Sequence, residues 1–193
     1  MIKYLKEKSN GFTIVELIVS LGVITMLASF LILYNKTNTA QIALSLETAK
    51  LVELINKSKS LSLSTYIEKG AACGYGINID YNSKSYTLFR YGSPTLTSGC
   101  ANIASSSINF LDSTYAELEK NFLPQNINFE KNNDYLNIIF FMPPDPKVLI
   151  WKNNSTLPIQ QNNPDYESKI YLTTKDSSFK KQIIVDTSGQ ISY

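Results

Sequence analysis

The pattern of apolar and polar positions begins with one long uninterrupted apolar run. From Leu17 to Tyr34 the chain carries no charged residue. The run from Phe12 to Tyr34 exceeds the roughly 20 residues that an α-helix needs to cross the apolar core of a bilayer. It therefore predicts a transmembrane helix over about residues 12–34.

A short basic segment precedes this run. It holds Lys3, Lys6 and Lys8 against Glu7, and basic residues on a short flank keep that flank in the cytoplasm.

Other interpretations of the apolar run fit less well. A cleaved secretory signal has an apolar region of about 7–15 residues followed by a small-residue cleavage site, whereas here the small-residue candidate, Gly11, precedes the run. A plain single-pass anchor explains the length and the lysines, and a buried soluble helix fits the unbroken apolarity poorly.

The helical pattern continues beyond the apolar run. Apolar residues recur at helical spacing, which predicts that one stripe packs on a domain: Ile42, Leu46, Ala49, Val52 and Ile55, widened by Leu44, Leu51 and Leu54. No proline occurs before Pro94, so we expect one helix from about Phe12 to about Leu63. The alternative is two helices with a break near Asn35–Asn38.

The composition changes at Gly70, where alternating residues and turn residues take over. This pattern predicts strands separated by turns and one short helix over Tyr115–Phe122. The expected strands are Cys73–Asp80, Ser85–Tyr91, Asn126–Glu130, Tyr135–Phe141, Lys147–Trp151, Lys169–Thr174 and Lys181–Asp186, with a short end strand after Ser188-Gly189. We therefore expect an α+β fold in which a long N-terminal helix (12–64) packs on an antiparallel β-rich domain (65–193).

Composition narrows the classes of function. The chain has 18 basic and 16 acidic residues, and residues 1–11 hold three lysines and one glutamate, so the remainder is neutral. No strong attraction to nucleic acid follows from this balance. The absence of histidine excludes histidine-based triads and histidine metal sites. With no catalytic constellation in the pattern, the sequence predicts no enzyme, cofactor or metal site.

Cys73 and Cys100 are the two cysteines. Both follow the predicted membrane span, on the side where disulfides persist. A disulfide between them is expected to stabilise the fold by about 3.5 kcal/mol in the chain-entropy model. The alternative is two buried free thiols.

Glu16 is the one carboxylate near the start of the apolar run. An ionisable side chain in such a segment costs about 2.5–3.5 kcal/mol at mid-bilayer and needs a partner. A plain anchor does not explain why a glutamate stands there, so Glu16 is the principal functional candidate.

The stretch Lys8-Ser9-Asn10-Gly11-Phe12-Thr13-Ile14-Val15-Glu16-Leu17-Ile18 closely resembles the cleavage and methylation motif of type IV prepilins and type II secretion pseudopilins. The resemblance covers about the first 34 residues. It implies that residues 1–11 are a cytoplasmic leader, that a membrane prepilin peptidase cleaves after Gly11, and that Phe12 becomes N-methylated. It further implies that Glu16 pairs with the Phe12 amine of a neighbouring subunit in a helical fibre.

The same resemblance implies partners, location and fold. The partners would be other pilin or pseudopilin subunits, an inner-membrane assembly platform and, before assembly, membrane lipid. The location would be the bacterial inner membrane, with the N-terminus cytoplasmic, and then a pilus or pseudopilus in the periplasm or at the cell surface. The C-terminal part, with Phe141-Met142-Pro143-Pro144-Asp145 and then Ile183 to Ile191, loosely resembles minor pseudopilins and minor pilins. We therefore expect a type IV pilin-like minor subunit. The alternative is a tip-located binding module that serves DNA uptake or adhesion.

Two further groups of residues were weighed as binding sites. Lys175, Phe179, Lys180 and Lys181 form a basic group at a hairpin tip. It would suit DNA capture by a tip-located subunit, although a solvated turn is the favoured interpretation. Asp165 and Glu167 are too few for the six to eight oxygens that Ca²⁺ requires.

Overall fold

The computed structural model describes residues 13–67, 72–92, 100, 115–132, 134–143, 147–153, 155, 157–158 and 167–193, with only the backbone at 33–38, 65–67 and 147. The chain divides into two compact units, Met1–Thr39 and Ala40–Tyr193. In the described part, one long helix, α1 (Ile14–Ile67), is followed by nine strands. The α+β class expected from the sequence is confirmed.

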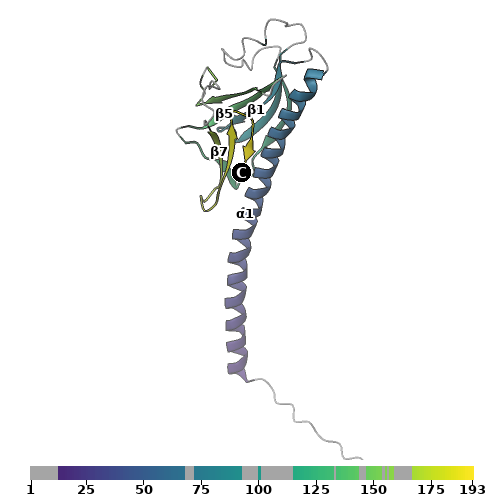
Figure 1. Cartoon of the computed structure of the whole chain (residues 1–193). Coiled ribbons are helices and arrows are strands. Elements are labelled where there is room, and N and C mark those ends of the chain that lie inside the picture. Colours follow the sequence, from purple (N-terminus) through teal and green to yellow (C-terminus); the bar gives the residue numbers. More distant parts are fainter. Residues whose placement is uncertain are drawn as a thin grey trace, which may run out of the picture. The chain divides into compact units, whose positions relative to one another are not determined.

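The second unit contains two antiparallel sheets. Sheet A has five strands in the order β3-β2-β1-β5-β6, and sheet B has four in the order β4-β7-β8-β9. In Figure 1, the C-terminal half of α1 runs along the sheets and β1, β5 and β7 are labelled. The strands are β1 (Gly74–Asp80), β2 (Ser85–Tyr91), β3 (Tyr115–Phe122), β4 (Ile127–Phe129), β5 (Leu136–Met142), β6 (Lys147–Lys152), β7 (Glu167–Thr174), β8 (Lys180–Asp186) and β9 (Ile191–Ser192).

Two predicted hairpins are confirmed. β1 pairs with β2 in a continuous register from Gly74↔Tyr91 to Asp80↔Ser85, and β7 pairs with β8 from Glu167↔Asp186 to Thr173↔Lys180. In the first turn the Asp80 carboxylate accepts hydrogen bonds from the backbone N–H groups of Asn82 and Ser83. A short side chain that satisfies turn amides in this way specifies where the chain reverses.

The prediction of a short helix over Tyr115–Phe122 was wrong, because this segment is strand β3. It pairs antiparallel with β2, from Ser85↔Phe122 to Tyr91↔Tyr115, with a register shift between Leu88 and Phe89. The Ala-Glu-Leu-Glu-Lys sequence favours a helix. Pairing along the free side of β2 satisfies a whole row of backbone groups, and that tertiary gain overrides a weak local preference.

The prediction for the buried stripe of α1 was partly wrong. Ile42 and Leu46 are 67% and 54% exposed, whereas Leu44, Leu51 and Ile55 are buried. Most of the expected stripe therefore packs on the sheets, and the exceptions are Ile42, Leu46 and Ala49. The helix also ends at Ile67, four residues later than the expected Leu63.

The main core lies between α1 and the two sheets. It combines Leu51 and Ile55 of α1 with Ile77 and Ile139 of sheet A and Ile170 of sheet B, among others. Burial of this apolar surface is the dominant favourable term in folding the second unit.

A second apolar cluster lies on the other face of sheet A. It contains Phe89, Phe140 and Trp151, and the Phe89 and Phe140 rings stack with their centroids 6.0 Å apart. Gly76 on β1 makes room for both rings, because a Cβ there would lie 2.7 Å from Phe89 Cζ. These three aromatic side chains therefore form a second buried layer on this face of sheet A.

Polar contacts tie α1 to both sheets. The buried Ser62 hydroxyl donates to the Phe141 carbonyl at 2.7 Å and accepts from the Tyr75 N–H at 3.0 Å. Tyr75 and Phe141 are directly opposite each other on β1 and β5, so one helix hydroxyl bridges two strands. Lys59 Nζ donates to the Gly189 carbonyl at 2.9 Å, next to β9 in sheet B.

Candidate functional site

The start of α1 has the chemistry of a capped helix N-terminus. Thr13 precedes the helix, and its Oγ1 accepts a hydrogen bond from the Glu16 N–H at 3.3 Å, while its carbonyl accepts from Leu17 N–H at 3.1 Å. A threonine followed three residues later by glutamate is the capping-box pattern. Glu16 therefore lies in the first helical turn, where the positive end of the helix dipole favours a negative charge.

Glu16 has no ion-pair partner among the described residues. Its side chain is exposed. Gly11 and Phe12, the residues assigned to cleavage and N-methylation, lie outside the described residues. Of the residues assigned to this site, the structure therefore describes Glu16 alone.

The helical segment after Glu16 is apolar and uncovered. Ile14–Ile32 is long and apolar enough to cross a membrane, either as a span or as part of a signal sequence, and none of it is buried in the protein. This supports the membrane character expected from the sequence.

The hydroxyl groups in this segment are satisfied within the helix itself. Ser20 donates to the Leu17 carbonyl at 2.9 Å, Thr25 to Gly22 at 2.9 Å, and Ser29 to the Thr25 carbonyl at 2.8 Å. Such back-bonding removes the need for a polar partner outside the helix. Glu16 is therefore the one described side chain of this segment that requires a charged or polar partner from elsewhere.

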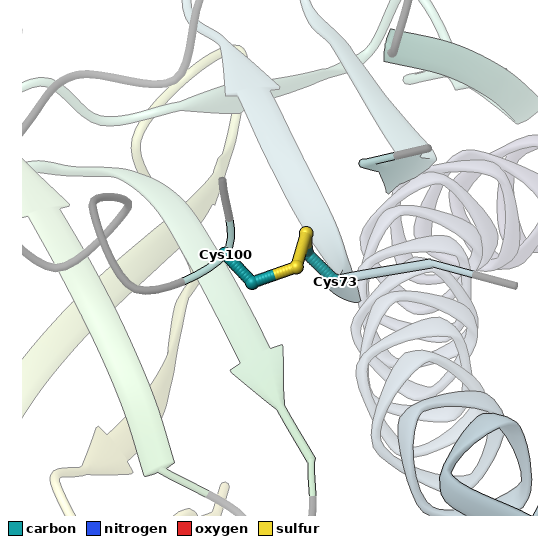
Figure 2. The surroundings of a disulfide bond; sticks show 2 residues. All are labelled: Cys73 and Cys100. Carbon is teal, nitrogen blue, oxygen red and sulfur yellow. A yellow bond between two sulfur atoms is a disulfide. The ribbon is translucent and has the colours of Figure 1, made fainter. Parts of the chain in front are cut away.

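A disulfide joins Cys73 and Cys100, whose Cα atoms are 5.3 Å apart. Figure 2 shows the bond at the start of β1. Cys73 also belongs to the Phe89–Trp151 cluster, and its N–H donates to the Tyr91 carbonyl at 2.8 Å. The crosslink therefore attaches Cys100 to the edge of the aromatic face of sheet A.

Reduction of this disulfide has a measurable expected effect. We expect the intact oxidised chain to be two hydrogens lighter than the reduced chain, and Cys73→Ser to lower the free energy of unfolding by about 2–5 kcal/mol. Non-reducing mass spectrometry and thermal unfolding measure these quantities. Two alkylatable thiols in the protein as isolated would contradict the pairing, and Ser58→Ala provides a control for removing one small buried side chain.

The basic hairpin tip does not form a free cationic cluster in the described part of the chain. Lys180 pairs with Glu130 at 2.7 Å and lies over the Tyr171 ring at 4.0 Å. Phe179 packs against the main core. Lys181 is adjacent to Lys180 on β8, and successive strand residues point to opposite faces.

Only one of the two carboxylates considered as calcium ligands lies within the described residues. Asp165 lies outside the described residues, and Glu167 pairs with Lys169 at 3.3 Å. Among the residues that the structure describes, no group of three or more histidine, cysteine, aspartate or glutamate side chains is placed to hold a metal ion.

Sequence reasoning missed a buried carboxylate on α1. Glu47 is 4% exposed, binds Lys50 Nζ at 2.6 Å, and accepts a hydrogen bond from the Tyr86 hydroxyl at 3.4 Å. Burial and the Glu47 charge raise the pKa of Tyr86, so this hydroxyl remains a donor. A polar residue beside buried apolar ones is the available signal, but the predicted stripe included the exposed Leu46 next to Glu47 and so did not show that Glu47 is buried.

Sequence reasoning also missed a polar cavity of about 230 Å³ beside the β1–β2 turn, which we call the amide hollow. It is lined mainly by side chains that carry hydrogen-bonding groups: Asn78, Asp80, Asn82, Lys131, Tyr135 and Asn137, with Tyr81 beside them. These residues come from separate strands and turns, so no local motif indicates the hollow.

Comparisons of the chain with protein-family models, with curated proteins and with solved structures find no match.

Proposed function

We propose that this chain is a structural subunit of the prepilin type, inserted into the bacterial inner membrane, processed there and built into a type IV pilus or a secretion pseudopilus. One observation carries the proposal. The Gly11-to-Glu16 motif leads directly into a capped helix whose first segment, Ile14–Ile32, is apolar and uncovered, and whose Glu16 has no ion-pair partner among the described residues. Uncovered apolar surface of this extent requires lipid or protein neighbours.

The residues of the motif have separate roles in this proposal. Gly11 is the small residue before the bond that a prepilin peptidase cuts. Phe12 then supplies the new amine, which is N-methylated. Glu16 binds the Phe12 amine of a neighbouring subunit, because a carboxylate in apolar surroundings needs a cationic partner.

The apolar segment has two successive environments in this proposal. Lipid covers Ile14–Ile32 before assembly, and the equivalent segments of other subunits cover it afterwards. The hydroxyls of Ser20, Thr25 and Ser29 already donate to carbonyls of their own helix. Neither environment therefore has to supply acceptors for them.

The second unit supports assignment as a minor pilin-like subunit. Its two antiparallel sheets pack with α1 around a continuous core, and its last strands include the segment that carries the C-terminal resemblance. The partners that follow are a prepilin peptidase, other pilin or pseudopilin subunits and an inner-membrane assembly platform. The engaged state of Lys180 does not favour nucleic acid as a further partner.

Processing is the direct test of this function. We expect the mature protein to begin at N-methylated Phe12, and we expect Gly11→Val to accumulate as the full-length form in the membrane because the peptidase no longer accommodates the side chain. Mass spectrometry of the N-terminal peptide from membranes and from sheared fibres measures both.

The control for this test is Gly22→Ala, which changes a glycine inside the apolar segment where a Cβ would meet nothing within 4 Å. It should be cut like the unaltered chain. Assembled protein that still begins with Met1 would contradict the proposal.

A further inference from the structure

The amide hollow is held in place by its own packing. The Tyr81 hydroxyl donates to the Leu136 carbonyl at 2.9 Å. The centre of the Tyr81 ring lies 4.8 Å from that of Tyr135, in an edge-on arrangement, and 5.4 Å from that of Phe129. The hollow therefore has a fixed aromatic side, and little ordering is required when a ligand binds.

The hollow also contains a fixed carboxylate in a tight turn. Asp80 accepts hydrogen bonds from Asn82 N–H at 2.9 Å, Ser83 N–H at 3.2 Å and the Ser83 hydroxyl at 2.7 Å. The Ser83 hydroxyl bond is the largest influence on the pKa of Asp80, which lies below its ordinary value. The carboxylate is therefore charged at neutral pH and keeps lone pairs for a further donor.

The hollow is close to electrically balanced. Lys131 supplies one positive charge, with its Nζ 4.6 Å from the centre of the Tyr135 ring, against the one negative charge of Asp80. The other hydrogen-bonding groups are the neutral amides of Asn78, Asn82 and Asn137. An anionic ligand would be attracted by Lys131 but repelled by Asp80, and a cationic ligand would meet the reverse. The hollow therefore favours a neutral ligand.

The amide side chains fit a ligand that both donates and accepts hydrogen bonds. Within the described residues, the side chains of Asn78 and Asn82 make no hydrogen bond, whereas Asn137 has a further interaction of its own. An asparagine amide offers two donors and one acceptor oxygen. Groups that can both donate and accept, as hydroxyls do, match such a set.

From these features we propose that the amide hollow binds one neutral sugar ring of a glycan. Hydroxyls of the ring exchange hydrogen bonds with Asn78, Asn82 and Asp80, and one apolar face of the ring lies near Tyr135. The volume of about 230 Å³ is below the roughly 300–1,000 Å³ of sites that enclose drug-sized ligands. The hollow thus holds a single ring, with the rest of the glycan outside it.

This inference goes beyond the proposed function and does not depend on it. Binding is a property of the second unit, and it is measurable on the full-length chain in detergent before any processing or assembly. Failure of cleavage after Gly11 would therefore leave the glycan proposal unaffected. Failure to bind a glycan would likewise leave the proposed prepilin function unaffected.

The test uses saturation-transfer difference NMR with the detergent-solubilised full chain. The probes are neutral oligosaccharides (lactose, maltotriose and chitotriose), a sulfated oligosaccharide from heparin, and an uncharged hexapeptide. We expect transfer to ring protons of at least one neutral oligosaccharide, with a far weaker signal from the sulfated one.

Variants locate the binding. We expect Asn78→Ala and Asn82→Ala each to weaken binding of the responding sugar by about fivefold, the usual effect of losing one hydrogen bond. Asn121→Ala, which removes an amide from a different part of sheet A, should bind like the unaltered chain. Thermal unfolding of each variant checks that the fold is retained.

Three results would overturn the proposal. The first is that no neutral oligosaccharide at millimolar concentration receives saturation transfer. The second is that Asn78→Ala and Asn82→Ala bind the sugar as well as the unaltered chain does, and the third is that the hexapeptide binds in preference to all the sugars. The last result would identify the hollow as a peptide site.

Discussion

Glu16→Ala is expected to enter the membrane and to be cut after Gly11, yet to be largely lost from assembled fibres. In the proposed fibre, the Phe12 amine of a neighbouring subunit would meet Glu16 in apolar, water-poor surroundings, where charge pairs are strongest. Removing one partner of a buried pair costs about 3–5 kcal/mol because the other charge is left uncompensated. We therefore expect the ratio of sheared-fibre protein to membrane protein to fall by at least about tenfold.

Two further variants test whether the charge of Glu16 is responsible for this loss. Glu16→Gln keeps the shape of the side chain and loses its charge, so it should fail like Glu16→Ala. Ser20→Ala removes a hydroxyl that donates only to the Leu17 carbonyl of the same helix, so it should assemble normally. Equal fibre incorporation of Glu16→Ala and the unaltered protein would rule out the pairing mechanism for an internal subunit. Such tolerance would instead fit a first-incorporated tip subunit, which has no neighbour ahead of it.

Ile55→Ala should strongly destabilise the second unit, whereas Leu46→Ala should not. Ile55 is fully buried among residues of both sheets, and Leu46 is 54% exposed on the same helix. Large-to-small changes in a core cost about 2–5 kcal/mol through lost burial and the cavity left behind. Exposed changes usually remain within about 0.5 kcal/mol.

Trp151 is a natural probe for this comparison. It is the one tryptophan of the chain and is 1% exposed, so its fluorescence emission will shift when the second unit unfolds. Denaturant titration of the full chain in detergent then gives both free energies. Equal midpoints for Ile55→Ala and Leu46→Ala would show that the assigned helix face is wrong.

The fold was predictable where local signals agree with tertiary packing. The β1–β2 hairpin combines alternating residues with an Asp80-centred turn, so the sequence alone located it. β3 was not predictable, because Ala116 to Lys120 favours a helix and only the neighbouring β2 backbone makes the strand preferable. The buried helix face was misassigned only near Ile42 and Leu46, because these residues and the buried Leu44 and Leu51 recur with the same helical period.

The candidate sites divide in the same way. The sequence indicated the disulfide, which the structure contains, because two cysteines after an apolar segment are an unusual feature. Glu16 is a candidate for the same kind of reason, since a carboxylate is unusual at the start of such a segment. The amide hollow could not, since Asn78 and Asn137 meet only when β1 pairs with β5, and asparagine is common in turns. Glu47 was hidden for the same reason, because its burial depends on which helix face the sheets cover.

The attachments of α1 to the sheets have a mechanical consequence. Lys57 pairs with Glu119 of β3 at 2.6 Å, Ser62 bridges β1 and β5, and Lys59 binds the Gly189 carbonyl beside β9. Tension applied along the helix would be shared as shear among three separate contacts. One lies on the edge strand of sheet A, one in the middle of sheet A and one on sheet B. No one of these contacts has to carry the whole load, so the second unit is built to resist peeling from its helix under traction.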